Sequence, residues 1–256
     1  MDQVVADNLV KVFPTPDGRE KRAVDGLSFR VADGEIYGLL GPNGAGKTTT
    51  LRMLSGLMVP SGGSARLSGF DVATQVNEVK RVLGFLTAGT GLYQRLTARE
   101  LLIYFAELHR MNAHQAAARA DHLIEWLGIG DFAHLRCGAL STGQRQRVNI
   151  ARALVADPPI LIMDEPTLGL DVLSNRVILQ FIQRERDAGK TIILSTHYLD
   201  EAETMCDRIG LLHDGRLAAE GDLAGLRRAS GEHRLSNIFL KMIHAEGALN
   251  PAESRS

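Results

Sequence analysis

The sequence predicts an α/β fold, in which a largely parallel sheet is covered on both faces. Three continuous apolar runs, at residues 160–163, 191–195 and 209–212, are typical of parallel strands buried on both sides. A glycine-rich loop at 41–48 joins an expected strand to an expected helix, which supports this fold class. With 256 residues, the chain can bury one large core or two small joined ones. We therefore expect one main unit with a subdomain.

Composition and patterning argue against several classes of protein. Lys and Arg number 29 and Asp and Glu number 30, so there is no strong basic field that would favour nucleic acid as a standing partner. The longest uncharged stretches, such as 53–65, are too short and too rich in Gly and Ser to span a membrane. The N-terminus lacks a signal-peptide pattern, and Cys137 and Cys206 are too few for a disulfide framework. We expect a reduced, cytoplasmic protein with no nucleic-acid partner.

The first 86 residues alternate short β-type runs with turn signals. A helix is expected at 48–58, and the breaker sequence at 60–63 ends it before another strand pair that ends near Leu86. The earlier runs predict strands that feed into one buried strand before the glycine-rich loop. These expected strands are residues 8–13, 27–31 and 35–40.

The segment from about 97 to 156 changes to helical patterns. The sequence from Thr97 to Glu100 fits a capping box and predicts the start of a first helix. A second helix is expected at 113–127, with Gly128 as its left-handed stop. The third begins at Ser141, whose hydroxyl can cap it. The sequence therefore predicts a helical subdomain in this segment.

The C-terminal part is less patterned than the rest. A turn is expected at Asp214 and Gly215, and the polar tail beyond it shows helical character at 236–243. The last residues have the composition of a disordered end. We expect a domain at 1–221 and a partly helical tail at 222–256 with a disordered end.

Residues 41–48 fit the phosphate-binding pattern G-x-x-x-x-G-K-[ST]. Small residues let the backbone curl so that successive N–H groups point at the β- and γ-phosphates, and the following helix adds positive potential. Lys47 adds a full charge, and the hydroxyl of Thr48 suits Mg²⁺. The alternative is a glycine-rich turn with an incidental lysine, which the flanking strand and helix argue against.

Two carboxylates follow the buried run 160–163, at the strand end where ligands bind in open α/β sheets. Asp164 is the candidate for holding Mg²⁺, and Glu165 for polarising the water that attacks the γ-phosphate. Alone, the pair could be two solvated carboxylates at the end of a strand. Together with the phosphate-binding loop, it predicts an ATP-hydrolysing site.

The sequence Leu140-Ser141-Thr142-Gly143-Gln144 resembles the signature motif of the ABC ATPases and lies at the start of an expected helix. In that family, the signature of one subunit closes over the ATP held by the other. The resemblance thus implies a dimer of two copies, with Ser141 and the amides near Gly143 at a γ-phosphate of the partner site. Thr142 stands where the family usually has Gly, which implies a modest change of loop geometry. The alternative is a purely structural role for Ser141 as a helix N-cap.

The resemblance extends to about Gly221 and implies a phosphate-loop ABC ATPase fold with a RecA-like core sheet, an N-terminal antiparallel β subdomain and a helical subdomain. Asp171 falls in a segment that resembles the D-loop, at the dimer interface. His197 matches the switch histidine that contacts the γ-phosphate, although a lone histidine after a strand is more often a surface or core residue. Phe13 matches the aromatic that stacks on adenine, with a core aromatic as the alternative.

The resemblance therefore implies Lys47, Glu165 and His197 as catalytic residues, and Thr48 and Asp164 as Mg²⁺ ligands. The residues that it places around ATP are Phe13, Gly41, Pro42, Asn43, Gly44, Ala45, Gly46, Lys47, Thr48, Thr49, Ser141, Gly143, Gln144 and Asp171.

One family element departs from the pattern. The Q-loop presents a glutamine just after a strand, expected here at 83–86, yet Ala88 stands at that place. Alanine offers no oxygen to Mg²⁺, which keeps Thr48 and the phosphates and fills its shell with water. We expect hydrolysis to survive and communication with a membrane subunit to weaken.

Residues 38–50 and the signature together look most like the NatA-type branch of sodium and antibiotic exporters. This resemblance implies an ATPase at the cytoplasmic face of the membrane, bound to a separate integral membrane permease. A non-transport ABC ATPase acting on DNA or the ribosome is the alternative, although such proteins usually carry two cassettes, coiled-coil arms or basic inserts. A regulatory ATP-binding module is a third hypothesis, which the intact candidate catalytic residues argue against.

Overall fold

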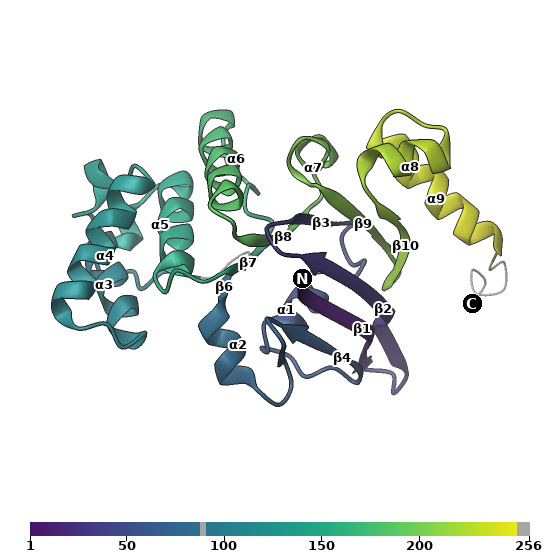
Figure 1. Ribbon diagram of the computed structural model, residues 1–256, viewed down its shortest axis with the longest axis horizontal. Helices are drawn as coiled ribbons and strands as arrows, with labels where there is room; N and C mark the ends of the chain where they lie inside the picture. The colour runs from purple at the N-terminus through teal and green to yellow at the C-terminus, as the bar shows by residue number, and fades with distance from the viewer. Residues whose placement is uncertain (88–90, 250–256) are drawn as a thin grey trace.

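The computed structural model describes residues 1–87 and 91–249, which fold around two sheets (Figure 1). The larger sheet has six strands. In spatial order they are β10 (Arg216–Gly221), β9 (Arg208–His213), β3 (Ile36–Leu40), β8 (Thr191–Thr196), β7 (Ile160–Asp164) and β6 (Leu83–Leu86). Neighbouring strands from β9 to β6 are parallel, whereas β10 pairs antiparallel with β9. The carboxyl ends of β3, β8 and β7 therefore meet at one edge.

The smaller sheet is antiparallel and lies beside the larger one (Figure 1). In spatial order its strands are β2 (Glu20–Ala32), β1 (Asp2–Pro14), β4 (Gly62–Leu67) and β5 (Phe70–Asp71). The first two form a long hairpin, and β4 returns to pair with β1. The predicted antiparallel N-terminal sheet is thereby confirmed.

Two helices in the first 86 residues differ from what the sequence predicts. Helix α1 (Lys47–Leu54) is shorter than the expected 48–58, because Gly56 adopts a left-handed φ of 68° and closes the helix end. Helix α2 (Val76–Val82) lies where we expected strands only. Its three valines recur every third residue and Val79 is buried, so helical spacing outweighed the β propensity of valine.

Helices fill the segment between β6 and β7 and form one end of the molecule (Figure 1). They are α3 (Ala98–Leu108), α4 (Ala113–Trp126) and α5 (Thr142–Leu154). The predicted capping box begins α3, where Thr97 and Glu100 bond each other's backbone amides. Gly128, with φ of 59°, follows α4 as predicted. The predicted helical segment thus contains these helices, and its treatment as a subdomain stays a prediction.

Two further helices flank the strand ends. Helix α6 (Val172–Asp187) follows β7, and the short helix α7 (Leu199–Met205) follows β8. On β7, Ile160 and Ile162 pack in the core shared with the N-terminal sheet, whereas Leu161 and Met163 pack toward α5 and α6. This alternation confirms the predicted sheet covered on both faces.

The C-terminal part is more regular than its sequence suggested. Asp214 and Gly215 have φ of 43° and 80° and form a two-residue hairpin turn between β9 and β10. Helices α8 (Leu223–Ser230) and α9 (Leu235–Leu249) then pack on β9 and β10 at the end opposite α3 and α4 (Figure 1). The expected disordered end lies outside the described residues. Among the described residues, no helix is long and apolar enough to cross a membrane.

Candidate active site

The loop between β3 and α1 is shaped by glycines in close backbone contacts. Gly44 and Gly46 have φ of 85° and 106°, in the left-handed region that favours glycine. A Cβ on Gly41 would lie 2.2 Å from the carbonyl oxygen of Leu212, and one on Gly46 would lie 2.4 Å from that of Ala23. The glycines therefore let this loop curl against strands β9 and β2.

This loop lines a cavity of about 480 Å³. Phe13, at the end of β1, is partly buried and lines the cavity rather than joining the described hydrophobic clusters. An aromatic surface beside a glycine-rich loop suits a flat base joined to a phosphate chain. The predicted contacts Asn43, Pro42 and Thr49 also lie in the wall. The full lining is Phe13, Pro14, Thr15, Pro16, Lys21, Ala23, Pro42, Asn43, Gly44, Gly46, Lys47, Thr48, Thr49 and Glu165.

The amine of Lys47 is nearly buried, with 6% of its side chain exposed. Its Nζ donates to the carbonyl oxygens of Gly41 at 2.6 Å and Pro42 at 3.2 Å. Burial lowers the pKa of Lys47, while the carboxylates of Glu165 and Asp164 act in the opposite direction. The ammonium group is thus held at the loop by carbonyl groups, in a position to face phosphate oxygens.

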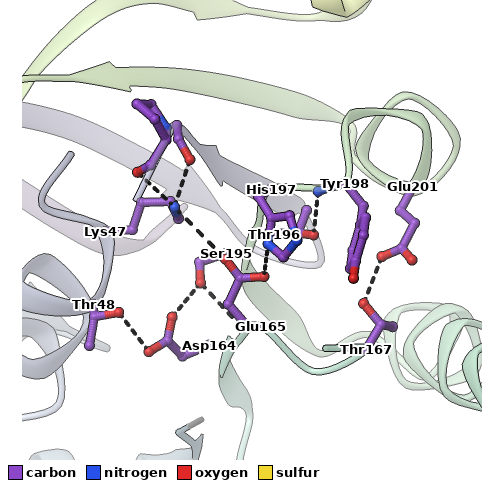
Figure 2. Close-up of polar contacts among 12 residues, drawn as sticks. Lys47, Thr48, Asp164, Glu165, Thr167, Ser195, Thr196, His197, Tyr198 and Glu201 are labelled. Carbon is purple, nitrogen blue, oxygen red and sulfur yellow. Dashed lines mark hydrogen bonds and ion pairs between the residues drawn. The ribbon is translucent and has the colours of Figure 1, made fainter. Parts of the chain in front are cut away.

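Asp164 ends β7 and is 2% exposed. Its Oδ2 accepts a hydrogen bond from Thr48 Oγ1 at 2.9 Å, and its Oδ1 accepts one from Ser195 Oγ at 2.5 Å (Figure 2). A buried carboxylate beside a threonine hydroxyl is a set of hard oxygen donors of the kind that Mg²⁺ prefers. The residues present therefore fit the predicted metal site.

Glu165 follows in a left-handed conformation with φ of 51°, which is uncommon for a non-glycine residue. Its Oε2 lies 2.7 Å from His197 Nδ1, and its Oε1 lies 3.8 Å from Lys47 Nζ. Because a carboxylate only accepts, this hydrogen bond places a proton on Nδ1 of His197. Figure 2 shows the three side chains turned toward one another, although they come from three separate segments.

The loop after Glu165 is held from two sides. The side chain of Gln146, in α5, donates to the carbonyl oxygen of Pro166 at 2.6 Å. Glu201, in α7, accepts a hydrogen bond from Thr167 Oγ1 at 2.9 Å (Figure 2). It also accepts one from Asn175 Nδ2, in α6, at 2.7 Å. These contacts connect the loop with the helix that begins at the signature motif and with the segment that follows His197.

The signature residues lie at the N-terminus of α5. Ser141 and Gln144 form a capping box, in which each side chain bonds the backbone amide of the other. A Cβ on Gly143 would lie 2.5 Å from Ser174 Oγ, so α5 and α6 approach closely there. Asp171 caps α6, and its hydrogen bonds to the backbone and hydroxyl of Ser174 lower its pKa. The cap predicted at Ser141 is present, and the cap at Asp171 is an additional finding.

The structure thus separates the predicted residues into two groups. Residues of the glycine-rich loop, the end of β7 and His197 converge at one edge of the sheet. Ser141, Gly143, Gln144 and Asp171 are absent from the described wall of the cavity, so their contact with nucleotide stays a prediction that requires a second chain. Ala88 lies outside the described residues.

Sequence reasoning missed Ser195 and Glu201, which contact the candidate residues. Ser195 was considered only as the end of an apolar strand, although a hydroxyl at the end of a buried run beside a carboxylate-bearing strand is a usable signal. Glu201 lies four residues after His197, and no sequence pattern connects it with Thr167.

Comparison with known proteins agrees with the resemblance to the ABC ATPases. The family described as "ABC transporter" matches residues 24–168, more than half of the chain. The chain is 42% identical over 223 residues to the ABC transporter ATP-binding protein NatA of Bacillus subtilis (strain 168), which covers 87% of the chain and 91% of that protein.

Two other relatives are export or resistance proteins by name. The chain is 38% identical to the daunorubicin/doxorubicin resistance ATP-binding protein DrrA of Streptomyces peucetius, over 94% of the chain and 70% of that protein. It is 44% identical to the Nod factor export ATP-binding protein I of Paraburkholderia xenovorans (strain LB400), over 79% of the chain and 66% of that protein.

Solved structures show the same fold. An ATP-binding subunit of an ABC transporter superposes with a TM-score of 0.84 at 29% identity, covering 94% of this chain and 99% of that one. A dimeric post-hydrolysis state of the ATP-binding cassette MJ0796, bound to ADP and Pi, gives a TM-score of 0.78 at 28% identity, covering 86% of this chain and 98% of that one.

Proposed function

Since the chain belongs to the ABC transporter family, we propose that this ATP-binding and ATP-hydrolysing subunit powers an exporter through a separate membrane permease. The observation that carries the proposal is the convergence of Lys47, Glu165 and His197, with Thr48 and Asp164 beside them, at one edge of the sheet. The names of two relatives, the Nod factor export protein I and the drug-resistance protein DrrA, support the exporter branch. The alternative role on DNA or the ribosome has no specific observation in its favour.

ATP is the proposed substrate, held by the glycine-rich loop with its base against Phe13. Lys47 supplies the positive charge for the phosphates. Hydrolysis joins the oxygen of a water molecule to the γ-phosphorus and breaks the bond to the bridging oxygen, giving ADP and phosphate. Glu165 orients this water and takes up its proton, while the hydrogen bond from His197 fixes the position of the carboxylate. Catalysis then depends mainly on position and charge.

Thr48 and Asp164 would hold Mg²⁺ through the hydroxyl and one carboxylate oxygen. The ion, when bound, offsets the negative charge of the β- and γ-phosphates. Thr48 lies at the start of α1, directly after Lys47, so one helix turn would present both groups to the same phosphates. Asp164 is fixed by the sheet, which limits how far its oxygens can move.

We further propose that two copies enclose two ATP molecules. Ser141, Gly143 and Gln144 of one copy would then cover the nucleotide on the loop of the other, and Asp171 would lie at the contact. Solved dimers of related cassettes support this arrangement. The complex would act at the cytoplasmic face of the membrane, where the permease holds it.

The test is the variant Glu165→Gln, which keeps the shape of the side chain and removes its basicity. We expect ATP affinity to stay within a few fold of the original and phosphate release to fall by about 10²-fold or more. Light scattering after gel filtration should show an ATP-dependent dimer, because the closed state is no longer relieved by hydrolysis. Glu78→Gln, a change at a half-buried residue of α2 that does not line the described wall of the cavity, is the matched control. Normal phosphate release from Glu165→Gln would refute the role of Glu165.

A further inference from the structure

Ser195 contacts both carboxylate residues of the candidate site, although it has no part in the function proposed so far. It lies on β8, is fully buried, and pairs in register with Asp164 on β7. Its hydroxyl donates to Asp164 Oδ1 at 2.5 Å. The backbone amide of Glu165 donates to the carbonyl oxygen of Ser195 at 3.0 Å. The hydroxyl oxygen of Ser195 lies 3.3 Å from the same amide.

The two oxygens of Asp164 have different partners. Oδ2 accepts from Thr48, a residue of the phosphate-binding helix. Oδ1 accepts from Ser195, and in the described part of the chain it has no other hydrogen-bond donor. A buried charged acceptor without a hydrogen-bond donor costs free energy. Without this hydroxyl, the Asp164 carboxylate would therefore rotate about its last side-chain torsion to reach another donor. Figure 2 shows Ser195 between Asp164 and Glu165.

A second buried hydroxyl on the same strand shows what a purely structural group looks like. Thr191, at the start of β8, accepts from the amide of Gly34 at 3.0 Å and donates to the carbonyl oxygen of Ala32 at 3.4 Å. Both partners are backbone groups, so Thr191 only joins β8 to the turn between β2 and β3. The Ser195 hydroxyl also accepts from a backbone amide, that of Glu165, but its proton goes to a side-chain carboxylate instead of a backbone carbonyl.

We propose that Ser195 is a positioning residue, which fixes the carboxylate of Asp164 with Oδ2 toward Thr48 and thereby sets the affinity of the site for a divalent cation. The inference rests on the proposed function, because it assigns the cation to Thr48 and Asp164. Ser195 itself contacts neither cation nor nucleotide. Its second contact, with the amide of Glu165, links the position of the next carboxylate to the same hydroxyl.

The test measures the binding of Mn²⁺, a paramagnetic substitute for Mg²⁺, to the purified chain with ADP present. Loss of the free Mn²⁺ signal in electron paramagnetic resonance reports binding without any catalytic turnover. We expect Ser195→Ala to weaken Mn²⁺ binding by about tenfold, as for loss of a hydrogen bond to a buried charge. Affinity for ADP alone, measured with EDTA present, should change less than twofold.

Two further variants keep the test decisive. Ser195→Cys fills the space of the hydroxyl with a slightly larger thiol, which is a weak donor, so this variant should also weaken Mn²⁺ binding even if Ser195→Ala fails to fold. Thr191→Val removes the buried hydroxyl at the other end of β8 and should leave Mn²⁺ affinity unchanged. An equal loss in Thr191→Val, or original affinity in both Ser195 variants, would overturn the inference. If the unaltered chain bound no Mn²⁺ with ADP and hydrolysed no ATP, the proposed function itself would fail instead.

Discussion

The carboxyl edge of the core sheet and the N-terminus of α5 differ in how their polar groups find partners. At the sheet edge, Glu165 forms an ion pair with Lys47 and a hydrogen bond with His197, which come from separate segments. At α5, the side chains of Ser141 and Gln144 bond only each other's backbone among the residues that the structure describes, and Ser141 is exposed. The first region is assembled within one chain, and we expect it to bind nucleotide alone. The second is a complete helix start with an exposed N-cap, and we expect it to form a site only when a second chain brings a nucleotide to it.

The largest expected effect comes from removing a charge at the carboxyl edge of the core sheet. Lys47→Ala removes the buried ammonium group that the loop carbonyls and Glu165 hold in place. We expect hydrolysis to fall by about 10²-fold or more, because this charge stabilises the transferring phosphate. We also expect nucleotide affinity to fall. Phosphate release would measure the loss of hydrolysis, and the binding of a fluorescent ATP analogue would measure the loss of affinity. Lys80→Ala, on α2, serves as control, and nucleotide affinity equal to that control would contradict the assignment.

A second effect sharpens the comparison by testing how rigidly the loop is built. A Cβ at Gly46 would lie 2.4 Å from the carbonyl oxygen of Ala23, whereas one at Gly44 has no heavy atom within 4 Å. Both positions have positive φ, so alanine at Gly44 carries backbone strain alone.

We therefore expect Gly44→Ala to lower the free energy of unfolding by about 1 kcal/mol, and Gly46→Ala by about 2–4 kcal/mol. Urea unfolding followed by circular dichroism gives both values. Equal losses for the two variants would show that the contact with β2 does not constrain the loop.

The sequence was most informative where local pattern and chemistry agree. Parallel strands, the glycine-rich loop and three helix caps follow from residue type and spacing, because each depends on neighbours along the chain. The helix at α2 was missed because its valines favour strands, and its burial depends on distant residues. The tail was underestimated because Leu226, Leu235 and Ile238 are buried only by packing on β9 and its neighbours.

The site followed the same division. Lys47, Asp164 and Glu165 belong to motifs whose residues are adjacent in sequence, so their place at the sheet edge could be predicted. The partners Ser195 and Glu201 come from other segments, and only the register of β7 with β8 and the packing of α7 bring them into contact. The hydrogen bond between His197 and Glu165 joins residues 32 positions apart. Its geometry was beyond sequence reasoning.

The smallest expected effect on a single chain tests the other half of the comparison. Ser141 and Asn112 are N-caps of α5 and α4, and each forms a capping box with a glutamine three residues later. Alanine at either position removes the same kind of cap and should lower the free energy of unfolding by about 1 kcal/mol. In the isolated chain, ADP affinity should therefore be unchanged in both variants, because neither side chain lines the described wall of the cavity.

The two caps should separate only when two chains meet. If Ser141 covers the nucleotide of a partner copy, Ser141→Ala should slow phosphate release at saturating ATP by about tenfold, as for loss of one hydrogen-bond donor in a preorganised site. Asn112→Ala has the same stability cost and should keep the original rate. The paired comparison removes helix stability as an explanation, since both helices lose an equivalent capping box. Equal rates in the two variants would mean that Ser141 only caps α5 and that the exposed helix start is not a site.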